Sequence, residues 1–223
     1  ASKSRGLGDV YKRQIVNILE GDTIKVGWAK KSLIPTEPVP LAGYGARKGA
    51  NFEGIDDTVF VKAVVFDNEI TKAAYVSMDL LIVPPNLDHE KILDQLSFEV
   101  DNLYLTASHT HSSIGGYLEG LAGKIFGGEY SENILEFITN KTILALEEAY
   151  YNKEKSKIGY GRIYASNFVT NRLVGDSIGT YDPFIRLIKI NTESGKNAAI
   201  FSYAAHATCC LLYTSDAADD WFC

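Results

Sequence analysis

Cysteine, long apolar runs and clustered positive charge are scarce in this chain, and each of these absences excludes a class of protein or leaves one open. Cys209, Cys210 and Cys223 are its only cysteines, and a body without cysteine is compatible with any compartment. The longest apolar run, residues 73–85, contains Asp79 and falls short of the roughly 18 to 20 residues of a membrane span. The 22 Lys+Arg are scattered and outnumbered by 28 Asp+Glu, which gives a net charge of −6. We therefore expect no transmembrane segment and no nucleic-acid partner.

The remaining composition is that of an ordinary globular protein. The chain has 223 residues, of which 46% are hydrophobic, 11% aromatic and 22% charged. These values exclude both intrinsic disorder and a collagen-like repeat. The length suits one large domain or two small ones.

The two ends differ in character from the middle. Residues 1–14 and 209–223 resemble translated sequencing-adapter read-through, and we predict that neither end is native. The alternative is a pair of natural flexible termini, since polar ends are common in any domain. We expect residues 15–208 to be an internal part of a longer domain, in which the lack of a visible signal peptide carries no weight.

The middle of the chain alternates between strand and helix patterns. Residues 23–29 alternate between apolar and polar, and residues 58–66 and 73–83 are β-branched and apolar; both patterns predict strands. The expected strands are residues 23–29, 58–66, 73–83, 103–107, 157–168, 184–191 and 198–205. Apolar residues spaced three and four apart predict a helix capped by Asn86 and another over 131–151. The fold class is therefore α/β (α+β), a strand-rich mixed β-sheet with helices packed on it, in an incomplete domain.

The sequence Ser-His-Thr-His-Ser at 108–112 lies where a buried strand ends and a long Gly-rich loop begins, with glycines from Gly115 to Gly128. In extended chain, residues two apart project to the same side about 6.5 to 7 Å apart, so His109 and His111 should face one space. Two neutral imidazoles can share a divalent metal, or one can bind it while the other meets the substrate. The alternative is a pair of loop histidines without a function.

Three further polar residues follow other predicted strands. His206 ends the strand at 200–205, and it is either a metal ligand shared with His109 or a satisfied core residue. Asp79 lies in an apolar segment and needs a partner. It could hold a ligating imidazole in its tautomer or cap the turn before Pro84. Arg172, in a polar loop, is either solvated or a fixed positive charge for an oxyanion.

Other catalytic motifs are missing from the sequence. It contains no G-x-S-x-G elbow, no Walker loop and no G-x-G-x-x-G after a strand. Ser112 next to His111 could imitate a nucleophile with its base, but adjacent residues in extended chain point to opposite faces. A metal site is therefore the stronger hypothesis.

Taken together, five segments resemble the N-terminal catalytic region of the neutral/alkaline ceramidase family in their order and spacing. They are Leu41–Gly45, Met78–Leu80, Thr106–Gly116, Asn171–Arg172 and Ala205–Thr208. The resemblance covers about residues 24–208, and its most specific part is His-Thr-His-Ser followed by paired glycines.

The resemblance implies a zinc amidase that cleaves the N-acyl bond of ceramide, or of a related N-acyl lipid or other amide, into a sphingoid base and a fatty acid. It makes His109 and His206 zinc ligands, and it places His111 and Arg172 against the reacting carbonyl or its oxyanion. Gly43 and Tyr44, in the first matching segment, are expected to bind substrate. The family completes its Zn²⁺ site with a Glu and a Tyr from much further along the chain, so we expect this fragment to be inactive.

The sequence departs from the family pattern after the second histidine. The family usually has Ser-Gly-Pro-Gly-Gly, whereas Ser112–Gly116 read Ser-Ser-Ile-Gly-Gly, which alters the wall of the expected pocket. The family is often secreted or membrane-associated, which implies substrate access from a membrane surface and leaves the compartment open. The alternative function is a metal-free binding or degenerate fragment of the same fold.

Overall fold

The computed structural model describes residues 17–18, 24–171 and 173–206, and it divides the chain into two compact units. We call residues 25–153 the first unit, and residues 154–206, together with 17–18 and 24, the second unit. The two ends predicted to be non-native, 1–14 and 209–223, lie outside the described residues.

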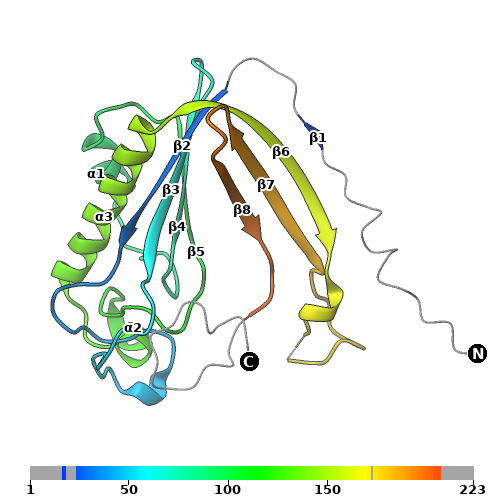
Figure 1. Cartoon of the computed structure of the whole chain (residues 1–223). Helices are drawn as coiled ribbons and strands as arrows, with labels where there is room; N and C mark the ends of the chain where they lie inside the picture. The colour runs from blue at the N-terminus through cyan, green and yellow to red at the C-terminus, as the bar shows by residue number, and fades with distance from the viewer. Residues whose placement is uncertain (1–16, 19–23, 172, 207–223) are drawn as a thin grey trace, which may run out of the picture. The chain divides into compact units, whose positions relative to one another are not determined.

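The first unit is built on a mixed sheet. Its strands are β2 (Ile24–Ser32), β3 (Phe60–Asp67), β4 (Lys72–Met78) and β5 (Asn102–Ala107), in the spatial order β5-β4-β3-β2 (Figure 1). β2 pairs with β3 and β3 with β4 in antiparallel fashion, whereas β4 and β5 are parallel. It follows that β2, β4 and β5 all point toward the same end of the sheet.

The period-two pattern of the central strands produces one buried face. Alternate residues of β3 and β4 are almost inaccessible to solvent: Val61, Ala63, Val65, Ala74, Val76 and Met78. The register places them opposite one another in cross-strand pairs. Burying this apolar row is the main source of stability of the unit.

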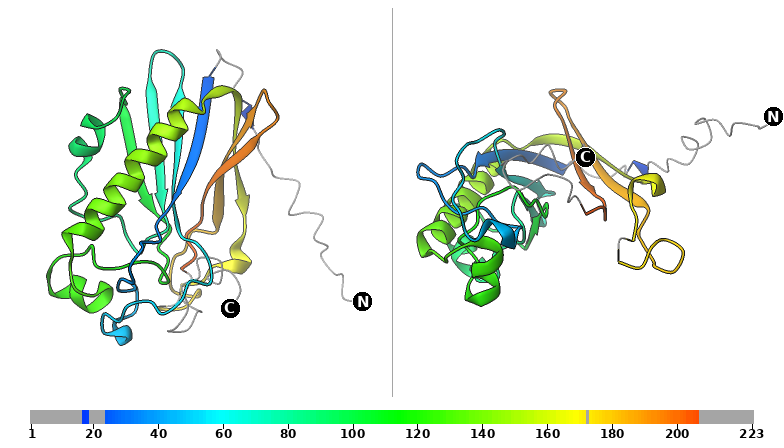
Figure 2. Two further views of the ribbon diagram at one scale, coloured as in Figure 1. Left: turned by 60° about the vertical axis from the view of Figure 1, so that its left-hand side comes forward. Right: turned by 90° about the horizontal axis from the view of Figure 1, so that it is seen from below.

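Helix α3 (Glu132–Tyr151) covers that face (Figures 1 and 2). It begins after Ser131, as the sequence predicts, and its buried side includes Leu135, Ile138, Leu146 and Ala149. These residues recur at three- and four-residue intervals, which places them on one stripe of the helix.

Two local predictions about helices are wrong. The helix expected to be capped by Asn86 is α1 (His89–Asp94), and its cap is Asp88, whose side chain accepts a hydrogen bond from the Lys91 N–H. Residues Gly120–Gly127, expected to be loop, form helix α2. The glycines of α2 lower its helix propensity, but Gly123 lies so close to Leu118 that a side chain would not fit there.

The second unit is an antiparallel sheet. It consists of β6 (Glu154–Tyr164), β7 (Phe184–Thr192) and β8 (Asn197–Ser202), with the short β1 (Asn17–Ile18) against β6. A 3₁₀ turn, η4 (Ser166–Phe168), follows β6. All three closing strands predicted from the sequence are present.

The predicted fold class is confirmed, because helices pack on a sheet that contains both parallel and antiparallel pairs. Among the described helices, none has the length and apolarity needed to cross a bilayer.

Replacing Asp67 with asparagine should lower the free energy of unfolding at neutral pH by about 1.5–3 kcal/mol, the value of a hydrogen bond to a charged group. The Asp67 carboxylate lies 2.5 Å from the Lys153 ammonium, and their side chains are 10% and 11% exposed. Burial alone would raise the pKa of Asp67, but hydrogen bonds from Lys153 and the Glu69 N–H and the attraction of nearby lysines outweigh it and lower the pKa.

The sign of the pH dependence follows from that lowered pKa. The stabilisation by Asp67 is present above the unfolded-state pKa of about 3.9 and is lost as the pH falls through the folded-state value. Urea unfolding at pH 7 and pH 3 should therefore show a smaller difference between wild type and Asp67→Asn at the lower pH. The exposed Asp56→Asn serves as the control. An Asp67→Asn effect that is equally large at both pH values would contradict the assignment.

Candidate metal centre

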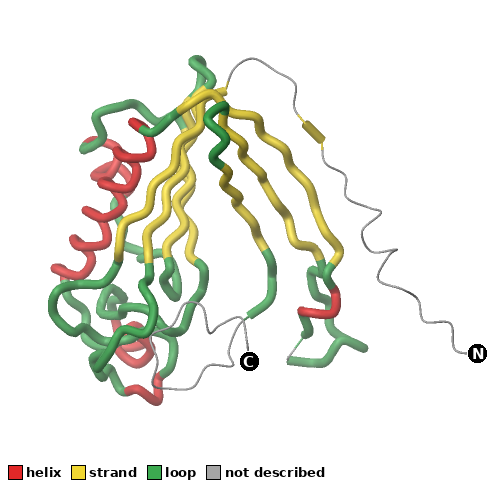
Figure 3. Tube along the Cα trace, viewed as in Figure 1, coloured by secondary structure: helices red, strands yellow, loops and turns green. Residues whose placement is uncertain are grey.

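Three loops meet at one end of the sheet of the first unit. Because β2, β4 and β5 run in the same direction, the chain leaves all three at that end. Figure 3 shows these loops gathered there, beside the 3₁₀ turn η3 (Gly45–Arg47) and α2. The predicted residues Gly43, Tyr44, Asp79, His109 and His111 all belong to these loops.

The loop after β2 and the loop after β5 are bonded to each other through their backbones. Leu41 and Ile114 form an isolated β-bridge, and the Ala42 N–H donates to the Ser113 carbonyl at 2.9 Å. Ser113 and Ile114 are the two positions at which the sequence departs from the pattern of the family that it resembles, and both are buried. These two positions therefore form part of the contact between the two loops.

The ring of His109 is held in one tautomer by the loop after β4. Its Nδ1 lies 2.7 Å from the Leu81 carbonyl oxygen. A carbonyl oxygen can only accept, so Nδ1 carries the proton and donates it, and in the neutral ring Nε2 then carries the lone pair. Histidines that bind metals commonly donate their other ring N–H in this way. His109 is exposed and has a left-handed backbone, with φ of 61°.

His111 lies beside His109 in a more covered position. The ring centroids are 5.1 Å apart at an interplanar angle of 84°, so the two imidazoles are neighbours. A ring nitrogen of each residue lies within 4.8 Å of one of the other. Two nitrogens that bind one zinc ion at about 2.0–2.1 Å lie about 3.3 Å apart.

Gly43 and Tyr44 form a wall against His111. Gly43 has φ of 113°, and a Cβ built on it would lie 2.7 Å from the Cα of His111. The Tyr44 ring is tilted against the His111 ring at a centroid distance of 4.9 Å. Only glycine allows this approach of the two backbones. Binding of substrate by Gly43 and Tyr44 stays a prediction.

Asp79 is buried, and its carboxylate is paired with groups of the neighbouring strand β3. Its carboxylate lies 2.8 Å from the Lys62 ammonium and accepts the Phe60 N–H at 3.0 Å. The hydrogen bond that orients His109 is donated to the carbonyl of Leu81, two residues further along. A role of Asp79 toward the metal ligand stays a prediction, and what the structure shows is a carboxylate that anchors the start of the Leu81 segment.

Tyr117 supports the same segment from another side. Its hydroxyl accepts the Ile82 N–H at 3.5 Å, and the side chain is fully buried. Burial raises the pKa of Tyr117 to about 12, so this hydroxyl stays protonated at any physiological pH. Its contact with Ile82 lies next to the carbonyl that orients His109.

Sequence reasoning missed Arg47. Its guanidinium is buried, with Nη1 donating to the carbonyls of Ala42 and His111. No sequence signal separates this residue from a solvated arginine, because its partners are backbone oxygens.

Two predicted residues do not belong to the described part of the first unit. His206 belongs to the second unit, where it follows β8. Arg172 lies outside the described residues. Their roles stay predictions.

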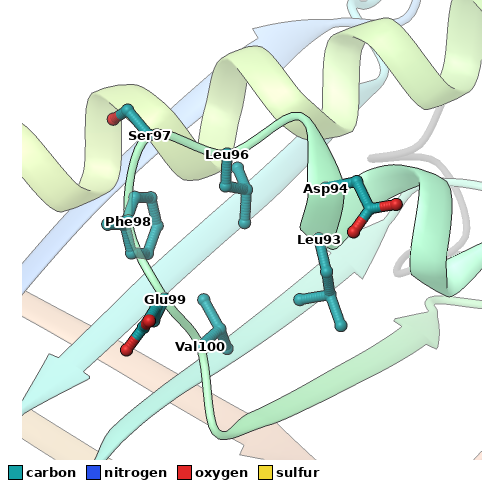
Figure 4. A pocket seen from close by; sticks show the side chains of 7 residues that line it. All are labelled: Leu93, Asp94, Leu96, Ser97, Phe98, Glu99 and Val100. Atoms are coloured by element: carbon teal, nitrogen blue, oxygen red, sulfur yellow. The ribbon is translucent and has the colours of Figure 1, made fainter.

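A separate hollow lies at the opposite end of β5. Leu93 and Asp94 of α1, together with residues 96–100 of the loop that follows, line it (Figure 4). It lies before β5 begins, whereas His109 lies after β5 ends. The hollow is therefore distinct from the candidate metal centre.

Comparison with solved structures shows which fold this is. A structure titled "Ceramidase complexed with C2" matches 84% of this chain with a TM-score of 0.69 at 21% identity. The neutral ceramidase from Pseudomonas aeruginosa also matches 84% of the chain, with a TM-score of 0.70 at 20% identity. The match covers 32% of each of those chains, so this chain spans about a third of their length.

A sequence-family match agrees with that fold. The model for the N-terminal part of neutral/alkaline non-lysosomal ceramidases matches residues 32–175, well over half of the chain. The matched range contains the three loops of the candidate metal centre, including His109 and His111. On this evidence the chain belongs to the neutral/alkaline non-lysosomal ceramidase family.

Proposed function

We propose that this chain carries part of the metal site of a zinc-dependent amidase that hydrolyses the N-acyl bond of ceramide or a related N-acyl lipid. The observation that carries the proposal is the hydrogen bond from His109 Nδ1 to the Leu81 carbonyl, which keeps the Nε2 lone pair suited to a metal. Family membership supports the substrate class.

The donor set supports zinc as the metal. Neutral imidazole nitrogens are among the preferred ligands of zinc, and His109 offers one. The resemblance assigns His206 as the second ligand, and His206 follows the end of a strand, as His109 does. When bound, zinc would act as a Lewis acid on the amide carbonyl and lower the pKa of the attacking water.

The remaining chemistry falls to side chains around the scissile bond. Water adds to the amide carbonyl, the C–N bond breaks, and the leaving amine takes up a proton, which yields a sphingoid base and a fatty acid. In this proposal His111 contacts the reacting carbonyl or its oxyanion, and it is held for that by Gly43 and Tyr44. Arg172 would add a fixed positive charge that stabilises the oxyanion. Its contribution to lowering the activation barrier would be about 3–4 kcal/mol, the cost of losing one oxyanion donor. Access of the lipid from a membrane surface stays a prediction.

Calorimetric titration of zinc into the metal-free chain tests the proposal. We expect saturation at one zinc ion per chain, reversed by a chelator. A chain that takes up no zinc would favour the second candidate function, a metal-free binding or degenerate form of this fold.

We expect the chain as printed to have little or no amidase activity. Catalytic zinc sites usually keep three protein ligands, and the chain spans about a third of the solved ceramidases that it matches. A fluorescent short-acyl ceramide, incubated with the zinc-loaded chain, should release no more fatty acid than a buffer control. Release that chelation abolishes would show that the residues present are sufficient for turnover.

A further inference from the structure

The positive charge of Arg47 is buried, so water cannot fully hydrate it. The residue ends η3, a short turn whose following residue, Lys48, adopts the left-handed conformation with φ of 53°. Arg47 is 9% exposed, whereas Lys48 beside it is exposed. Burying a guanidinium is costly unless hydrogen bonds compensate for its lost hydration, so its contacts indicate what it does.

Those contacts join two loops of the candidate metal centre. Nη1 of Arg47 donates to the Ala42 carbonyl at 2.8 Å and to the His111 carbonyl at 2.6 Å. The guanidinium carbon also lies 4.9 Å from the centre of the Tyr44 ring, within the range of a cation–π interaction. A single side chain therefore touches the loop that carries Gly43 and Tyr44 and the loop that carries His111.

The position of the His111 ring depends on both loops. Tyr44 packs against one part of the ring and His109 against another, while Gly43 faces the Cα and Cβ of His111. Arg47 holds the carbonyl of His111 itself and the peptide that precedes Gly43. A shift of either loop would change how the imidazole is presented to its neighbours.

We propose that Arg47 is a positioning residue that fixes the orientation of the His111 imidazole. It acts through the His111 carbonyl and the Tyr44 ring and does not itself meet the substrate. The relevance of this orientation to catalysis rests on the proposed function, because it matters only if His111 contacts the reacting carbonyl.

The test is a long-range ¹H–¹⁵N spectrum of the histidine rings in the metal-free full chain, recorded for wild type, Arg47→Met, Arg47→Lys and Lys48→Met. Met keeps the apolar stem but donates no hydrogen bond. Lys keeps the charge but is shorter and lacks the planar group that faces Tyr44. Lys48→Met removes one positive charge from the adjacent exposed position and is the matched control.

We expect the His111 ring signals to shift or broaden in Arg47→Met, to move less in Arg47→Lys and to stay unchanged in Lys48→Met. The signals of His89, at the start of α1, should be the same in all four proteins. Unchanged His111 signals in a folded Arg47→Met would overturn the proposal. If that variant fails to fold, Arg47→Lys decides in the same way, because unchanged His111 signals there would overturn it.

The spectra are recorded without metal or lipid, so they separate this inference from the proposed function. A failure to bind zinc with altered His111 signals would refute the metal site and leave the role of Arg47 intact. Normal zinc binding with unchanged His111 signals would refute the role of Arg47 alone.

Discussion

Replacing His109 with alanine should weaken zinc binding by more than about 100-fold, since loss of even an outer hydrogen-bond partner costs about 10–100-fold in affinity. The imidazole of His109 is already oriented by the Leu81 carbonyl at 2.7 Å. Binding a metal there requires no change of tautomer. Calorimetry on the wild type and the variant measures the ratio of the two dissociation constants directly.

His89→Ala is the matched control for that experiment. His89 is an exposed histidine at the first position of α1 and is not among the residues assigned to the candidate metal centre. Its removal should leave the zinc affinity unchanged. Equal losses in both variants would mean that the metal binds histidines without selectivity and would contradict the assigned site.

Replacing Gly43 with alanine should destabilise the chain by about 3–5 kcal/mol, because strain at positive φ and overpacking each cost about 1–3 kcal/mol. The new Cβ would meet the Cα and Cβ of His111 at 2.7 Å, and this contact involves backbone that cannot easily move. Thermal unfolding should show a midpoint lower by roughly 6–20 °C, at about 2–4 °C per kcal/mol for a chain of this size.

Gly120→Ala separates the two causes. Gly120 also has a positive φ, 78°, but a Cβ there would meet nothing within 4 Å. It should therefore cost only the backbone strain, about 1–3 kcal/mol, without the added overpacking. If Gly43→Ala were no more destabilising than Gly120→Ala, the close packing of Gly43 against His111 would be wrong.

The sequence predicts the strands and α3 well because each of these elements is buried on one side, and its apolar residues form a recognisable local pattern. β3 is a run of apolar and β-branched residues in which Lys62 is the one polar residue before Asp67, and α3 has apolar residues three and four apart. The sequence Gly-Leu-Ala-Gly-Lys-Ile-Phe-Gly of α2 has no such signal, because its glycines are typical of loops. Its helix is decided by tertiary contacts such as that between Gly123 and Leu118.

The site could be predicted only where side chains carry it. His109 and His111 stand out because histidine is rare in this chain and both follow a strand. The Leu81 carbonyl that orients His109, and the carbonyls that Arg47 bonds, leave no trace in the sequence, since every residue has a carbonyl. The sequence predicts that the buried carboxylate of Asp79 needs a charged or hydrogen-bonding partner, but only the fold shows that this partner is Lys62 of the neighbouring strand.

The most direct test of the metal site is the ¹⁵N spectrum of the His109 ring before and after addition of one equivalent of zinc. The hydrogen bond to Leu81 predicts that Nδ1 stays protonated in both spectra and that the Nε2 resonance alone moves to the position of a metal-bound nitrogen. Zinc that binds while both nitrogens of His109 keep their metal-free resonances, or that binds through Nδ1, would contradict the site described for this chain.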